Sequence, residues 1–130
     1  MVENKVGLIA YADRFGSGKI RDFSEIIKEH FNGYFGHIHL LPTIFPHGGK
    51  DAGFDCITHL QINQLVSEKK EGKVLDGWEE IKNITGKERN SPGVDVMVDV
   101  IINHISSKNL MFQDVLEKGE ESKILGFIFT

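Results

Sequence analysis

The sequence predicts an α/β fold in which helices cover a parallel sheet. Apolar runs typical of strands alternate along the chain with segments whose apolar residues recur at helical spacing. This strand–helix alternation is the pattern of βαβ units. Residues 94–102 form an apolar run rich in β-branched residues, which predicts a strand buried on both faces.

Composition favours one small globular domain over residues 1–130. The net charge of −4, without a cluster of Lys and Arg, argues against nucleic acid and anionic membranes as partners. No apolar run approaches the roughly 20 residues of a membrane span, and we find no signal peptide. The single cysteine, Cys56, excludes an internal disulfide and favours the reducing cytoplasm.

The first half of the chain predicts two strands around a helix. Residues 6–12 and 34–41 are the strands, and a helix is expected from about residue 19 to residue 31. We expect Ser17 to cap this helix and Gly33 to end it in a left-handed conformation. The helical face consists of Ile20, Phe23, Ile26, Ile27 and Phe31.

The second half of the chain contains loops, a helix and a third strand. In chain order we expect a loop at 43–55, no assigned structure at 56–66, a charged surface excursion at 67–73, and a helix from Gly77 or Trp78 to about Ile84. A strand over 94–102 comes next, then a short helix over 112–118 and an apolar run over 124–129.

Polar clusters follow all three predicted strands. Right-handed crossovers should bring the ends of parallel strands to one side of the sheet, where α/β proteins bind ligands. The loop at 47–55 holds two carboxylates, Asp51 and Asp55, beside the aromatic ring of Phe54. Carboxylates accept hydrogen bonds from sugar hydroxyls, and an aromatic face covers the apolar side of a sugar ring. The loop therefore predicts a sugar site.

Five segments together resemble glycoside hydrolase family 13, the α-amylase superfamily, and within it the sucrose phosphorylase branch. They are Tyr-Ala-Asp-Arg at 11–14, His-Leu-Leu-Pro at 39–42, Asp-Ala-Gly-Phe-Asp at 51–55, Val-Asp-Val-Ile-Ile-Asn-His at 98–104, and the segment 112–122 that starts with Phe-Gln-Asp-Val-Leu. The Asp-x-x-x-Asn-His pattern alone is moderately specific for the superfamily. The combination is highly specific for the branch.

The resemblance implies a (β/α)8 barrel, of which this chain would form the first three β/α units. Members of the family transfer a glucosyl unit with retention, using an aspartate nucleophile on strand four and a glutamate acid/base on strand five. In this branch phosphate accepts the glucosyl unit. The implied partners are thus a glucoside such as sucrose and phosphate, and no cofactor is implied.

The resemblance also implies roles for residues of this chain. Asp51 would hold a hydroxyl of the donor glucosyl unit, Phe54 would line its pocket, and His104 would donate to the primary hydroxyl. Asp99 and Asn103 would brace the end of their strand.

Asp13 and Arg14 leave two interpretations open, a simple turn ion pair or a role in shaping the site. His37, His39, His47 and His59 raise the question of a metal site, but they lack the Cys/His spacing of structural zinc. We predict no metal, and we expect His39 to line the barrel interior.

The chain also departs from the family pattern. Nothing after Ile124 resembles the segments with the nucleophile or the acid/base, so we predict no catalytic residue and no activity for the chain alone. An alternative is a non-catalytic half-barrel that binds a partner chain or sugar weakly. A flavodoxin-like regulator fits the alternation but does not explain the motif at 51–55.

Two structural expectations follow from these departures. Residues 66–77 insert a charged segment, and residues 90–93 lengthen the next turn, both as surface loops. The third strand would present an apolar edge, which favours self-association.

Overall fold

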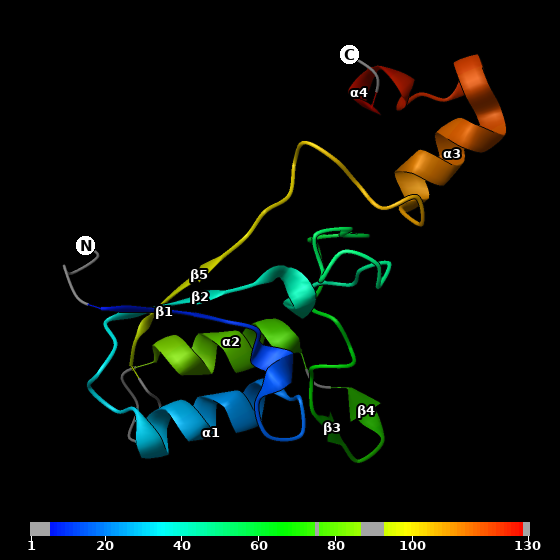
Figure 1. The fold of residues 1–130 in the computed structure, drawn as a ribbon. Coiled ribbons are helices and arrows are strands. Elements are labelled where there is room, and N and C mark those ends of the chain that lie inside the picture. Colours follow the sequence, from blue (N-terminus) through cyan, green and yellow to red (C-terminus); the bar gives the residue numbers. More distant parts are fainter. Residues whose placement is uncertain (1–5, 75, 87–92, 129–130) are drawn as a thin grey trace.

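A three-stranded parallel sheet organises the molecule. The computed structural model describes residues 6–74, 76–86 and 93–128. Within them, β1 (Gly7–Ala10), β2 (His37–Leu40) and β5 (Asp95–Val98) pair in the order β1-β2-β5. Helices α1 (Ile20–His30) and α2 (Gly77–Thr85) lie together against one face of this sheet (Figure 1). The predicted α/β class with a parallel sheet is confirmed.

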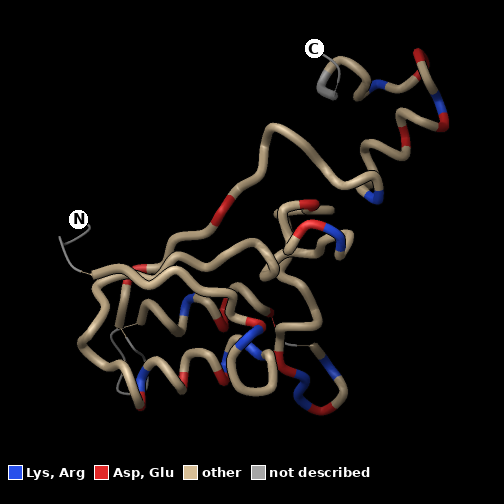
Figure 2. The backbone as a smooth tube through the Cα atoms, in the orientation of Figure 1, with Lys and Arg blue, Asp and Glu red and all other residues tan. Residues whose placement is uncertain are grey.

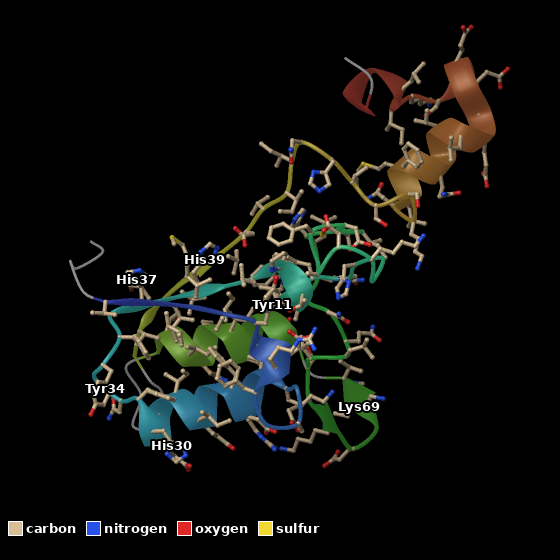
Figure 3. The ribbon with its side chains drawn as sticks, viewed as in Figure 1. Tyr11, His30, Tyr34, His37, His39 and Lys69 are labelled. Atoms are coloured by element: carbon tan, nitrogen blue, oxygen red, sulfur yellow. The ribbon has the colours of Figure 1, made fainter. Side chains whose placement is uncertain are left out.

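The two faces of the sheet differ in burial. The strands are in register, and His37 of β2 lies opposite Gly7 of β1 and Asp95 of β5. Side chains alternate between the faces of a strand. One set enters the hydrophobic core: Leu8, Ala10, Ile38, Leu40, Val96 and Val98. His37 and His39 lie on the side away from the helices (Figure 3).

The prediction that residues 94–102 form one strand buried on both faces is wrong. The strand β5 ends at Val98, and its side chains alternate between exposed and half-buried positions. Met97 is 53% exposed and Ile102 is 90% exposed. Both helices that pack on this sheet lie on the same face, so β-branched composition alone does not bury the other face.

Helix α1 packs through the face that the sequence predicts. Phe23 and Ile27 are buried in the core, and Gly33 has the left-handed φ of 80° expected after the helix. The prediction that Ser17 caps α1 is wrong, because Lys19 occupies the cap position. Ser17 instead donates to the Asp22 carboxylate from both its amide and its hydroxyl.

Helix α2 begins where the sequence predicts. Asp76 caps it by accepting a hydrogen bond from the Trp78 amide at 3.0 Å. The first helical residue, Gly77, lies so close to Ile62 that a Cβ on it would come within 2.4 Å of that side chain. Trp78 packs its ring 5.8 Å from that of Phe45. The amino-terminal end of α2 is thus fixed against the loop that follows β2.

The charged excursion at 67–73 forms a hairpin. Strands β3 (Lys69–Lys70) and β4 (Lys73–Val74) pair antiparallel around Glu71 and Gly72, which both have positive φ. At its base, the buried Glu80 carboxylate accepts a hydrogen bond from the Glu68 amide. Lysine and acidic residues alternate along this hairpin (Figure 2). The predicted turn extension at 90–93 lies almost entirely outside the described residues.

The last part of the chain leaves the sheet. After β5 the backbone runs without regular structure to α3 (Leu110–Lys118), which is followed by a 3-10 turn, η3 (Gly119–Glu121), and by α4 (Leu125–Ile128). Figure 1 shows α3 and α4 reaching away from the sheet and its helices. Among the described residues, no helix has the length and apolar character that crossing a membrane requires.

Candidate functional site

The ends of β1 and β2 are joined by a hydrogen bond between two 3-10 turns. Asp13 lies in η1 (Ala12–Arg14) and Thr43 in η2 (Pro42–Ile44). The Thr43 hydroxyl donates to Asp13 Oδ1 at 2.6 Å. Arg14 Nε lies 3.6 Å from Asp13 Oδ2, but the Arg14 side chain is 74% exposed, so this ion pair contributes little. Asp13 therefore braces the loop after β2.

The loop that carries Asp51 is closed at its base around Asp55. A bridge pairs His47 with Cys56, and the Gly48 amide donates to the Asp55 carbonyl at 3.0 Å. The Lys50 amide donates to Asp55 Oδ2 at 3.2 Å. Burial acts to raise the pKa of Asp55, but the backbone N–H donors around its carboxylate outweigh burial and lower that pKa. Asp55 thus holds the loop together as an ionised brace.

Asp51 lies at an exposed turn whose backbone is tightly constrained. The Phe54 amide donates to the Asp51 carbonyl at 2.7 Å, and the two residues between them have positive φ, 48° at Ala52 and 93° at Gly53. A Cβ on Gly53 would lie 2.6 Å from the Thr43 amide nitrogen. The turn therefore presses against η2, which leaves Asp51 exposed and Phe54 half-buried.

His104 joins the end of the third strand to this loop. Its Nε2 lies 3.1 Å from the Phe54 carbonyl oxygen, across 50 positions of sequence. A carbonyl only accepts, so Nε2 carries a proton. The side-chain carbonyl oxygen of Asn103, Oδ1, lies 3.0 Å from the other ring nitrogen, Nδ1. The convergence of this strand end with the Asp51 loop, predicted from the strand–helix alternation, is present in the structure.

Asp99 is held from the neighbouring strand. His39 Nε2 on β2 lies 3.0 Å from Asp99 Oδ1, and each side chain is 25% exposed. Asp99 Oδ2 is buried and has no hydrogen-bond partner among the described residues. The pair lies on the face of the sheet opposite the helices, where Figure 3 places His39. Asp99 thus attaches the segment after β5 to β2, whereas Asp13 joins the turns that follow β1 and β2.

Sequence reasoning missed His59 as a structural contact. It considered His59 only among possible metal ligands, but His59 Nε2 accepts a hydrogen bond from the Ile101 amide at 3.0 Å. Within residues 6–74, 76–86 and 93–128, which the structure describes, no three His, Cys, Asp or Glu side chains are arranged to hold a metal ion. No local sequence pattern indicates the hydrogen bond between Ile101 and His59, because the partner of His59 is a backbone group 42 positions away.

The sequence is similar to curated phosphorylases along almost its whole length. A sucrose phosphorylase from Bifidobacterium adolescentis is 38% identical over 129 residues, covering 99% of this chain and 23% of that protein. A sucrose 6(F)-phosphate phosphorylase from Thermoanaerobacterium thermosaccharolyticum is 33% identical over the same span. The chain thus spans about a quarter of the length of these relatives. No protein-family model matches the chain.

Solved structures agree with the sequence comparison. The crystal structure of a sucrose 6F-phosphate phosphorylase superposes with a TM-score of 0.76 and 32% identity, covering 95% of this chain and 21% of the other. A debranching enzyme from Nostoc punctiforme superposes with a TM-score of 0.71 at 18% identity, which supports the fold alone. Along almost its whole length, this chain is therefore similar to a portion of the sucrose phosphorylases, which are enzymes of glycoside hydrolase family 13.

Proposed function

We propose that this chain supplies the donor-sugar part of a glucosyl phosphorylase. In the completed barrel, the enzyme would transfer a glucosyl unit from sucrose or a related glucoside to phosphate, with retention of configuration. The chain itself would bind and orient the donor. The nucleophile and the acid/base would come from the parts of the barrel that follow in the family, so this chain alone would not turn over substrate.

The observation that carries the proposal is the contact between His104 and the Phe54 carbonyl. This contact joins the Asn-His motif to the Asp51 loop, and each is one of the segments by which the sequence resembles the family. The contact leaves Asp51 and His104 exposed and Phe54 half-buried. A carboxylate, an aromatic ring and an imidazole within one loop region form a set that suits a sugar ring.

We assign the following roles in this site. Asp51 accepts a hydrogen bond from a hydroxyl of the donor glucosyl unit, Phe54 lines its pocket, and the His104 ring reaches its primary hydroxyl. Asp55 closes the loop beneath Asp51 and does not contact sugar. Asp99 and Asn103 keep the strand end in place, and Asp13 supports the loop through Thr43.

A chimera tests this proposal directly. Residues 1–130 replace the matching quarter of the Bifidobacterium adolescentis sucrose phosphorylase, and formation of α-glucose 1-phosphate from sucrose and phosphate is measured. We expect an active chimera. The substitution Asp51→Asn should lower kcat/KM for sucrose by about 10- to 100-fold, because it weakens a hydrogen bond to a charged acceptor.

The matched control is Glu120→Gln in η3, which removes an exposed carboxylate outside the site. It should leave the kinetics unchanged. A folded but inactive chimera would contradict the proposed function. Unchanged kinetics in Asp51→Asn would contradict only the role of that residue.

One observation favours a second candidate, a non-catalytic half-barrel that binds a partner chain. Ile9 and Met97 are 67% and 53% exposed on the face of the sheet that the helices leave open. A face of this kind is covered by protein in a barrel. Mixing the chain with the separate remainder of the relative should then give a stable complex in size-exclusion chromatography that does not carry out phosphorolysis.

A further inference from the structure

The stretch between β5 and α3 lacks regular structure but is attached at several points to one region of the chain. Asp99 contacts His39, the Ile101 amide donates to His59, His104 contacts the Phe54 carbonyl, and the Ser106 amide donates to the Cys56 carbonyl at 2.9 Å. We call residues 99–106 the tethered segment. His104 therefore occupies its position because the residues around it are held individually.

The contact at His59 differs from the other contacts because it requires a neutral imidazole ring. A backbone N–H only donates, so the Nε2 atom of His59 must offer its lone pair to Ile101. The His59 ring is therefore neutral, with its proton on Nδ1. Protonation would place a second N–H against the Ile101 amide and remove the hydrogen bond.

The His59 ring is held in the orientation that this contact needs. It packs edge-on against Phe45, with ring centroids 4.8 Å apart and an interplanar angle of 71°. Phe45 is itself 1% exposed and packs against Trp78 of α2. The core thus fixes the His59 ring. The hydrogen bond from the Ile101 amide then fixes the backbone of the tethered segment relative to that ring.

Few other contacts fix the backbone between Asp99 and His104. The side chains of Val100 and Ile102 are 58% and 90% exposed, so burial does not hold them. Ile101 packs only partly against the core. The hydrogen bond to His59 is therefore a main restraint on the three residues that precede Asn103 and His104.

We propose that His59 is a positioning residue for the donor site, whose neutral ring fixes the Ile101 backbone and thereby places His104 beside the Asp51 loop. This inference rests on the proposed function for its kinetic consequence. The claim that His59 restrains the tethered segment can be tested on its own, because this restraint does not depend on catalysis.

The charge state of His59 gives the proposal a pH dependence. Burial lowers the pKa of His59 below its ordinary value of 6.5, and burial is its only resolved cause. Within five positions of His59 the titratable groups are Asp55 and Cys56. The rest of its loop carries His47, Lys50 and Asp51, the tethered segment carries Asp99 and His104, and η2 carries none. As the pH falls through the lowered pKa, the ring becomes charged and the restraint is lost.

The test compares two substitutions at His59 in the chimera. His59→Gln places an amide oxygen near the position of Nε2 and keeps an acceptor that does not titrate. His59→Leu removes the acceptor. We expect His59→Leu to raise KM for sucrose by about tenfold, the effect of one unsatisfied backbone donor, and His59→Gln to stay within about twofold of the parent at neutral pH.

The pH profile separates a positioning role from a merely structural one. KM for sucrose in the parent chimera should rise as the pH falls through the lowered pKa of His59, and this rise should be absent in His59→Gln. His30→Gln is the matched control, because His30 is an exposed histidine at the end of α1. It should keep the parent profile. The same acid limb in His59→Gln as in the parent would overturn the proposal.

Amide hydrogen exchange supplies a readout that needs no activity. In the 130-residue chain at one fixed pH, the Ile101 amide should exchange about tenfold faster in His59→Leu than in the parent and His59→Gln. Equal exchange in all three would overturn the proposal. An inactive parent chimera would reject the proposed function, while the exchange result would still decide the role of His59.

Discussion

At the scale of single residues, the turn from Asp51 to Phe54 depends on two successive residues with positive φ. Ala52 has a φ of 48° and Gly53 a φ of 93°. The first conformation is strained for an alanine, and the second suits glycine. Contact with Thr43 adds a steric reason for glycine at the second position. The exposed position of Asp51 therefore depends on the backbone conformation of this turn.

This geometry predicts opposite effects at neighbouring positions. Gly53→Ala should destabilise the chain by about 2 kcal/mol or more, because a Cβ would meet the Thr43 backbone in a conformation that disfavours it. Ala52→Gly should be neutral or stabilise the fold by up to about 1 kcal/mol, because it relieves strain. Urea denaturation midpoints measure both effects. A stable Gly53→Ala variant would show that the turn has another backbone conformation.

Some residues of the site were predictable from sequence, and others were not. Asp51, Phe54 and His104 belong to short motifs, so local sequence is enough to select them. The acceptor role of His59 depends on the Phe45 ring and on a backbone group 42 positions away, neither of which leaves a local pattern. The residue type of Ser17 predicts a helix cap, but its hydroxyl donates to the Asp22 carboxylate instead.

At the scale of elements, Asn109 connects α3 to the rest of the molecule. Its Oδ1 accepts hydrogen bonds from the amides of Met111 and Phe112, which caps the helix. Its Nδ2 donates to the Ile57 carbonyl at 2.5 Å. One buried side chain thus both starts α3 and attaches it to the loop that follows the Asp51 turn.

Substitution of Asn109 separates these two roles. Asn109→Ala should cost about 1–2 kcal/mol, since it removes the cap and the attachment together. Asn109→Ser keeps a capping oxygen and loses the donor to Ile57, so it should cost less. Asp76→Ala on α2 is the comparison, because the Asp76 side chain accepts from the nearby Trp78 amide of its own helix. Thermal unfolding followed by circular dichroism measures all three, and an equal effect of Ala and Ser at position 109 would contradict the capping role.

The helices were easier to predict than the strands. Amphipathic spacing fixes α1 and α2, because each helix buries one face whatever lies beyond it. Strand length depends on partners, and β5 stops at Val98 although the apolar run continues to Ile102. The sequence does not predict the β3–β4 hairpin, because its strands consist mostly of lysine; Glu71 followed by Gly72 is its local turn signal.

At the scale of the whole molecule, the sheet has two open edges and one open face. Strands β1 and β5 are the outer strands of the sheet order. On the face away from the helices, Ile9 is 67% exposed and Met97 is 53% exposed. Outer strands with apolar residues promote pairing between chains, and lysine at such positions suppresses it. The strand–helix alternation predicted this sheet, but not which face would stay open.

We expect the 130-residue chain to self-associate through these strands. The double substitution Ile9→Lys with Met97→Lys should shift the chain towards monomer, because it places charge on both outer strands. Leu60→Lys with Leu65→Lys is the matched control, since both leucines are exposed outside the sheet. Sedimentation velocity over a range of concentrations measures the effect. Equal association in both variants would show that contact occurs elsewhere.

The order of the sheet also bears on how the chain is made. In the three-stranded sheet, each strand pairs with the strand of the same sheet that follows it in the chain. Thus β1 pairs with β2, and β2 pairs with β5. A ribosome therefore releases β2 when β1 and α1 already exist, and β5 when that pair is available as a template. Within the described sheet, each new strand can add to strands that have already left the ribosome, and none has to displace an earlier strand. Assembly of this portion of the barrel can keep pace with translation, one β/α unit at a time.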